Sequence, residues 1–235
     1  MWSHSQQHTR SAGETDFGGL LGRDAIARDV RKLAFRPAEY AHPTWLPTGL
    51  PIDLMASLAR SPRTRRLVSV CMQPSSGVRP DGWDGVAACD ALALLDGEAL
   101  ELLARMIGVA LLHQDIRKCI AGELLRSTSE QLGASLIGFA RSSAAIIVGS
   151  HTATFALGAN DLSSAVDGAG YRMVAGALAE APHWLQDRIR IKLPKAIDQR
   201  IAIDHIPRDA MRAIALRTAR HLPKPWSTSF VPKRG

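Results

Sequence analysis

The chain has 235 residues, of which 46% are hydrophobic and 22% charged, a globular balance that excludes a wholly disordered protein. Its net charge of +7 is uneven, because residues 185–235 hold twelve basic against four acidic side chains and so carry +8. Abundant Ala and Leu with only 5% aromatic residues favour helices over a β-sandwich. We therefore expect a mainly α-helical protein. No apolar run is long enough to span a membrane, so we expect the protein to lie in the cytoplasm.

The cysteines Cys71, Cys89 and Cys119 lie far apart in the sequence, and no C-x-x-C motif occurs. This spacing suggests neither a disulfide framework nor a zinc site. We therefore expect buried, reduced thiols, in agreement with a reducing compartment.

Residues 1–32 are polar and rich in His, Gln, Ser and Gly. Such a composition predicts a flexible N-terminal extension, with one short helix over 24–33. We expect a single helical domain over 33–235. The stretch 73–85 holds prolines, glycines and Asp-Gly turn chemistry, so it is a possible internal linker.

The segment Phe35–Pro47, FRPAEYAHPTWLP, gathers three prolines and three aromatic residues into thirteen positions, and we call it the strap. Each proline fixes its own φ and pushes the preceding residue out of the helical region, so a rigid, non-helical segment is predicted. Its rings would bury large areas if they packed. Two interpretations stay open: a lid over a helical body, or a partner-binding surface that uses Tyr40, His42 and Trp45.

An irregular helical bundle is predicted to follow the strap in the sequence. The run Leu100–Ile120 carries apolar residues at three-, four- and seven-residue steps, as a buried helix or helix pair requires. His113 lies on that apolar face and has no second ligand at metal spacing, so we interpret it as a core or helix-junction histidine. The run 144–148 fits a strand or a buried helix equally well. The other expected helices cover 52–60, 63–72, 86–95, 98–112, 115–126, 129–140, 162–179 and 207–222.

The stretch near 188–193 has a different period. Arg188, Arg190 and Lys192 alternate with aliphatic residues, which predicts at most a short strand or extended edge with three cations on one side. Such an edge is a candidate surface for contact with an acidic partner.

The motifs of the common enzyme families are absent from the sequence, including the P-loop, G-x-G-x-x-G, H-E-x-x-H and G-x-S-x-G patterns. Gly149-Ser150-His151 places a Ser beside a His, but adjacent residues rarely form a triad with a third, orienting carboxylate. We therefore expect no catalytic residue, no cofactor and no metal site.

Four patches in family order resemble the SctK (YscK) family of bacterial type III secretion systems, or injectisomes. The strap is similar to that family's Phe-x-Pro-Ala-x-Tyr-x-His segment. The run LELLARMIGVALLHQDIRKCI is similar to its Leu-rich helix followed by His and Arg-Lys-Cys. Trp184–Pro194, WLQDRIRIKLP, resembles its basic-aliphatic stretch, and the last helix ends in a basic, proline-broken tail. Residues 1–32 extend beyond the family core, and 127–165 match only as helical.

The resemblance implies a cytoplasmic adaptor of the sorting platform, without enzyme activity and required for secretion in virulence or symbiosis. Its implied partners are the cytoplasmic, forkhead-associated-like domain of the inner-membrane ring protein (SctD class) and the pod protein (SctQ class). Through them it would contact the SctL-class stator and the SctN-class ATPase indirectly. It would lie at the inner membrane only through the apparatus.

Two other classes of protein remain as alternatives. The basic C-terminal third would suit a regulatory nucleic-acid-binding protein, although interleaved stacking aromatics and an evident recognition helix are missing there, so nucleic acid is an unlikely partner. An enzyme of unknown type would require a ligand-filled pocket.

Overall fold

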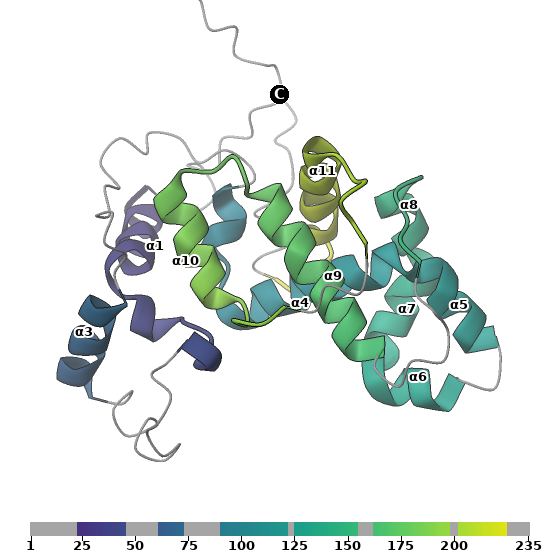
Figure 1. Ribbon diagram of the computed structural model, residues 1–235, viewed down its shortest axis with the longest axis horizontal. Helices are drawn as coiled ribbons and strands as arrows, with labels where there is room; N and C mark the ends of the chain where they lie inside the picture. The colour runs from purple at the N-terminus through teal and green to yellow at the C-terminus, as the bar shows by residue number, and fades with distance from the viewer. Residues whose placement is uncertain are drawn as a thin grey trace, which may run out of the picture.

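The computed structural model describes residues 23–45, 61–72, 90–121, 125–154, 162–197 and 202–224. These residues are mainly helical and include no strand, so the predicted irregular helical bundle is confirmed. Two helices, α4 (Gly97–Leu111) and α9 (Leu162–Ala177), cross at the centre of the molecule (Figure 1). In the described part of the chain, no helix is both long and apolar enough to cross a membrane.

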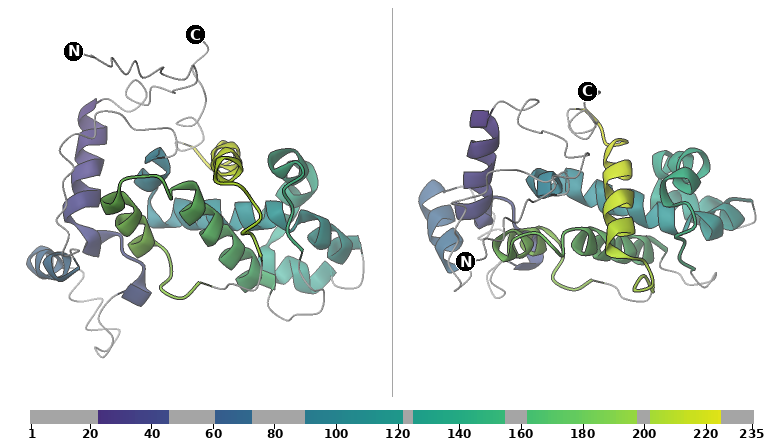
Figure 2. Two further views of the ribbon diagram at one scale, coloured as in Figure 1. Left: turned by 45° about the horizontal axis from the view of Figure 1, so that its top comes forward. Right: turned by 90° about the horizontal axis from the view of Figure 1, so that it is seen from above.

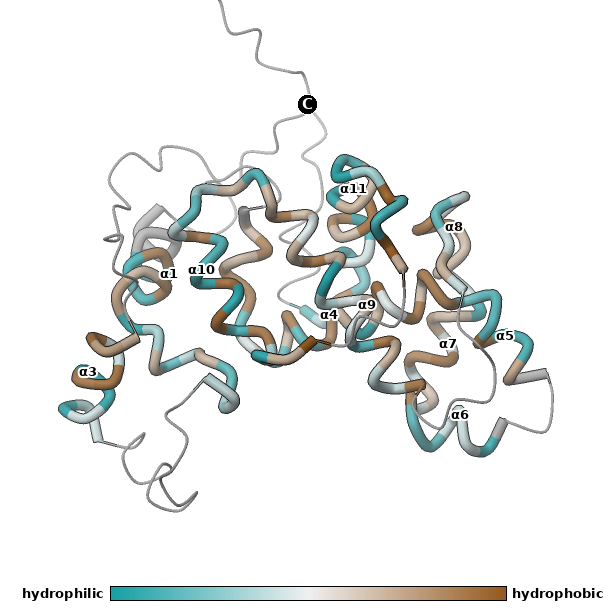
Figure 3. The backbone as a smooth tube through the Cα atoms, in the orientation of Figure 1, coloured by the Kyte–Doolittle hydropathy of each residue, from teal (hydrophilic) through white to brown (hydrophobic). Residues whose placement is uncertain are grey.

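Helix α4 is the apolar axis of the fold. Its N-cap Asp96 accepts a hydrogen bond at 2.8 Å from the Ala99 amide, which satisfies one of the free N–H groups of the first turn. From Leu100 to Leu111 most of its side chains are buried, so the helix is covered on nearly all sides. Figure 3 shows the hydrophobic colouring along α4 and the polar colouring of the outer helices α5 (His113–Ala121) and α6 (Leu125–Leu132).

Helices α4 and α9 touch through their backbones at two glycines. A Cβ atom added to Gly108 would clash with the carbonyl oxygen of Val166, and one added to Gly170 would clash with that of Ala104. Only glycine permits so close an approach of two helices. The small residues of α9 therefore allow a neighbouring helix to approach closely.

The remaining central helices pack around this pair. Helix α11 (Arg208–Ala219) lies against α9 and α4, and α7 (Ala134–Ser142) and α8 (Ala144–Val148) cover α4 farther along. The run 144–148 is thus helical. The helix predicted over 129–140 is divided between α6 and α7, because Gly133 has a φ of +81° that a continuous helix does not allow.

A second group of elements lies at the other end of α4 (Figure 2). It contains α1 (Arg23–Phe35), the short 3₁₀ turns η2 (Pro37–Glu39), η3 (Pro43–Trp45) and η4 (Asp90–Leu94), α3 (Pro62–Cys71) and α10 (His183–Lys192). Helix α1 confirms the helix predicted over 24–33. The predicted boundary at residue 32 falls inside α1, whose Val30, Leu33 and Ala34 are buried.

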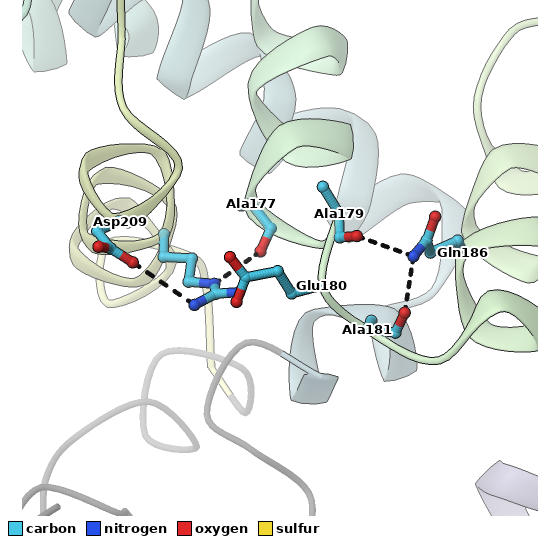
Figure 4. A network of polar contacts seen from close by, with 7 residues as sticks. Ala177, Ala179, Glu180, Ala181, Gln186 and Asp209 are labelled. Carbon is cyan, nitrogen blue, oxygen red and sulfur yellow. Dashed lines mark hydrogen bonds and ion pairs between the residues drawn. The ribbon is translucent and has the colours of Figure 1, made fainter.

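The turn between α9 and α10 fixes where α10 lies. Gln186 donates hydrogen bonds from Nε2 to the carbonyl oxygens of Ala179 and Ala181, at 3.0 and 2.7 Å (Figure 4). From α11, Arg212 contacts the carboxylate of Glu180 and donates to the Ala177 carbonyl at 3.4 Å. The turn is therefore held from both sides.

The extended edge predicted near 188–193 is wrong, because α10 continues to Lys192. The buried side chains of α10 are those of Leu185, Arg188, Ile189 and Lys192. Their three- and four-residue spacing is that of one helix face. Two of the four are cations, which the period-two interpretation had placed on the solvent side.

Some predicted features lie outside the described residues. These are the segment 1–22, the helix over 52–60, the linker over 73–85, residues 86–89 and Cys89. Among the cysteines that the structure does describe, both are free thiols. Cys119 is buried as expected, whereas the expectation is wrong for Cys71, which is exposed at the end of α3.

Candidate functional site

Helix α10 carries a fully buried arginine. Arg188 is 0% exposed, and its Nη2 donates to the Ala34 carbonyl at 2.8 Å while its Nη1 reaches the Met72 carbonyl at 3.5 Å. Ala34 lies in the last turn of α1, and Met72 caps α3. One side chain therefore joins the ends of two helices to α10. Its Nε is buried without a hydrogen-bond partner among the described residues.

Lys192, one turn farther along α10, is also buried, with 7% of its surface exposed. Its Nζ donates to the carbonyl oxygens of Ala93 and Leu95, at 2.6 Å each, and lies 5.1 Å from the centroid of the Tyr40 ring. Within the described segments, no carboxylate lies at ion-pair distance from this ammonium group. Burial lowers the pKa of Lys192 to about 7, an effect that the charge of Asp96 partly opposes.

The strap lies against these two cations. The Tyr40 hydroxyl donates to the Leu33 carbonyl, and burial raises the pKa of Tyr40. The Trp45 indole N–H donates to the Leu193 carbonyl at 2.7 Å, and the His42 amide donates to the Ile191 carbonyl at 2.8 Å. These three bonds tie the strap to the end of α1 on one side and to the C-terminal end of α10 on the other.

The exposed part of this region centres on Trp45. The guanidinium carbon of Arg190 lies 5.5 Å from the centroid of the Trp45 ring, and the Lys195 ammonium lies 5.8 Å from it. Both cations are exposed, whereas the indole is half-buried. The Thr44 hydroxyl oxygen accepts from the Lys195 amide at 2.9 Å, which fixes the loop after α10 beside the strap.

All six residues predicted as interface candidates therefore lie in one cluster, which we call the strap junction: Tyr40, His42, Trp45, Arg188, Arg190 and Lys192. The sequence had assigned them to two separate surfaces. The three cations do not form a row, because Arg188 and Lys192 point inward and only Arg190 reaches solvent. The hydrogen bonds of Tyr40 and Trp45 to backbone carbonyls are those expected of a lid. Partner binding by the strap junction stays a prediction.

Sequence reasoning missed Thr44 and Lys195, which complete the strap junction. The hydrogen bond from the Lys195 amide to Thr44 and the contact of the Lys195 ammonium with the Trp45 ring each join residues about 150 positions apart. A single sequence carries no local signal for such contacts. His113, by contrast, lies where it was predicted, buried between α4 and α5 with its Nδ1 2.9 Å from the Ala110 carbonyl. In the described segments, no group of His, Cys, Asp and Glu could hold a metal ion.

Residues 30–227 match a family of type III secretion proteins, so the protein is a component of a bacterial type III secretion system. The family is YscK, described as YOP proteins translocation protein K, and the chain belongs to it. The match includes the strap, the α4–α9 pair and α10, and it confirms the family that the four sequence patches resembled. No curated protein and no solved structure matches the chain.

Proposed function

We propose that the protein is a non-catalytic adaptor of the cytoplasmic sorting platform. In this role it bridges the cytoplasmic domain of the SctD-class inner-membrane ring protein and the SctQ-class pod protein, and secretion requires it. It lies in the cytoplasm, peripheral to the inner membrane through the apparatus, and contacts the SctL-class stator and SctN-class ATPase indirectly. The family match over residues 30–227 is the observation that carries the proposal.

The strap junction supports a role in positioning rather than in chemistry. Arg188 and Lys192 bind four carbonyl oxygens from three separate places in the chain: that of Ala34 in α1, that of Met72 at the end of α3, and those of Ala93 and Leu95 at η4. These bonds hold α1, α3, η4 and α10 in one rigid arrangement. A bridge between two partners needs such rigidity, because a flexible body would lose the fixed geometry between its two contacts.

The exposed side of the strap junction offers a docking surface within this proposal. Arg190 and Lys195 place two positive charges beside the half-buried Trp45 ring. Aromatic and arginine side chains are enriched where interfaces gain most of their binding energy. We therefore assign contact with an acidic face of the ring protein to Arg190, Trp45 and Lys195, in place of the predicted row of three cations.

A clean deletion tests the function in the cell. Secretion and assembly of the cytoplasmic pods should be lost, while the membrane rings still form. Normal export of secreted proteins from the deletion strain would contradict the proposal.

Reconstitution tests the two contacts directly. The purified chain should form a complex with both the ring protein's cytoplasmic domain and the pod protein, and the complex should survive nuclease treatment. Arg190→Glu should weaken binding of the ring protein by roughly tenfold or more, because reversal adds repulsion at an interface. Arg126→Glu makes the same charge change at an exposed position of α6 and is the matched control. Equal binding by the two variants, with equal thermal midpoints, would remove Arg190 from the interface.

A further inference from the structure

A groove opens between the end of α1, the turn η2 and helix α3. Its volume is about 670 Å³, and we call it the arginine groove. The lining residues that matter here are Phe35, Arg36, Arg63, Arg65, Arg66 and Val70. Phe35 and Arg36 begin the strap, and the sequence patterns assign no role to the arginines or to Val70 of α3.

The arginine groove has more positive charge than its own acidic residue can balance. Glu39 is the acidic residue in its lining, and its carboxylate already lies 3.4 Å from Arg36 and 3.9 Å from Lys32. Arg63, Arg65 and Arg66 have no ion-pair partner in the part of the chain that the structure describes. The Nε of Arg65 is moreover buried without a hydrogen-bond acceptor there. Buried donors in folded proteins are nearly always paired, so this nitrogen points to an absent acceptor.

Apolar side chains accompany the arginines. Phe35 is 47% exposed, and Leu67 and Val70 on α3 are 63% and 64% exposed. Leu67 lies one turn from both Arg63 and Val70, so the charged and aliphatic residues share one side of the helix. Ser69 is the buried residue of α3, and no side chain of this helix belongs to the apolar core. A helix with aliphatic residues turned to solvent beside a groove is typical of a binding surface.

We propose that the arginine groove binds an acidic segment of a protein partner, one with two or more carboxylates next to an apolar side chain. The carboxylates would pair with the guanidinium groups, which hold such groups through two parallel hydrogen bonds. The apolar side chain would cover Phe35, Val70 and Leu67. Nucleic acid fits less well, because aliphatic side chains give bases no surface for stacking. That the partner belongs to the secretion apparatus rests on the proposed function, whereas the binding chemistry does not.

A peptide titration tests the arginine groove on the full chain. The probe is a short fluorescein-labelled peptide of alternating Glu and Leu residues, followed by fluorescence anisotropy. The double variant Arg63→Glu/Arg66→Glu should weaken its binding by roughly tenfold or more. The control Arg117→Glu/Arg126→Glu makes the same change in net charge at exposed positions of α5 and α6, and should bind within about twofold of the unmodified chain.

A second variant separates the apolar contribution from charge. Leu67→Ser/Val70→Ser keeps every arginine and should still weaken the Glu-Leu peptide, while a Glu-Gly peptide should bind poorly to all chains. Both α3 positions are exposed, so thermal midpoints should stay unchanged. This variant also keeps the test valid if the arginine reversals disturb α3.

Three results would overturn the proposal. Equal losses in both double reversals would show a response to bulk charge alone. Equal affinity for the Glu-Leu and Glu-Gly peptides would remove the apolar contact. A single-stranded oligonucleotide that binds more tightly than the peptide, and loses affinity with Arg63 and Arg66, would make the surface one for nucleic acid. Reconstitution with the ring and pod proteins is scored separately, so failure at the groove and failure of the proposed function remain distinguishable.

Discussion

The α4–α9 pair and the strap junction are built on opposite physical principles. The pair packs mainly through apolar side chains, with one ion pair between Arg105 and Asp167, and its two glycines bring one backbone against the other. The strap junction is only partly buried, and Arg188, Lys192 and Trp45 hold it by donating hydrogen bonds to carbonyl oxygens. The pair should therefore respond to changes in volume, and the strap junction to changes in charge and protonation.

The largest effect is expected at the helix crossing. Gly170→Ala adds a single methyl group, but that group clashes with the rigid backbone of Ala104. The helices must separate, which should lower the free energy of unfolding by about 3 kcal/mol. Urea denaturation of the purified chain measures the loss.

Gly138→Ala is the control for this substitution. Gly138 lies in α7 with an exposed position and no atom within 4 Å of an added Cβ, so the same mutation should stabilise the protein by about 0.5 to 1 kcal/mol. A similar response of both variants would show that α4 and α9 do not meet at their glycines.

An intermediate effect is expected at Arg188. Arg188→Met replaces the aliphatic stem of the arginine with an unbranched apolar side chain. It leaves the carbonyl oxygens of Ala34 and Met72 without their donor. The expected loss is about 2 kcal/mol, the cost of removing charge-assisted bonds from buried acceptors. Arg190→Met on the exposed side of the same helix should change stability by less than about 0.5 kcal/mol. Equal denaturation midpoints for the two variants would argue against the burial of Arg188.

The smallest effect, counted per pH unit, is a dependence of stability on pH. Because the pKa of Lys192 is about 7 in the folded chain and 10.5 when unfolded, the unfolded chain binds more protons between these values. The free energy of unfolding should then rise with pH through this window, by roughly 1 kcal/mol per unit, and this group adds almost no slope more than about a unit below its folded pKa. Asp29, Lys32 and Asp96 act on Lys192 as well, and Tyr40 faces it.

The measurement compares the unmodified chain with Lys192→Met in urea at pH 7, 8 and about 9. The rise should be present in the first and missing in the second, since only Lys192 differs. Parallel curves would mean that the ammonium group is not desolvated.

The difference between the two regions also decides what the sequence could predict. Helix α4 was predicted within a residue or two because its apolar side chains repeat with the helical period. Helix α10 was missed because its inner face includes Arg188 and Lys192, which any hydropathy pattern counts as polar. The strap was recognised as an aromatic, proline-rich segment, although it forms two short 3₁₀ turns where a non-helical course was predicted. Its contact with α10 was not predicted. The Trp45 bond reaches a backbone carbonyl 148 residues away, and every residue has such a carbonyl.

The bond from Arg188 to Ala34 joins residues 154 positions apart. A ribosome that adds about 5 to 20 residues per second needs roughly 10 to 30 s to make the chain between them. During that interval α1 and the strap have been synthesised, but the helix that anchors them has not. Helix α1 and the strap therefore cannot complete their packing until the C-terminal third has been synthesised. In a chain that ends before α10, they would lack the helix to which they are hydrogen-bonded.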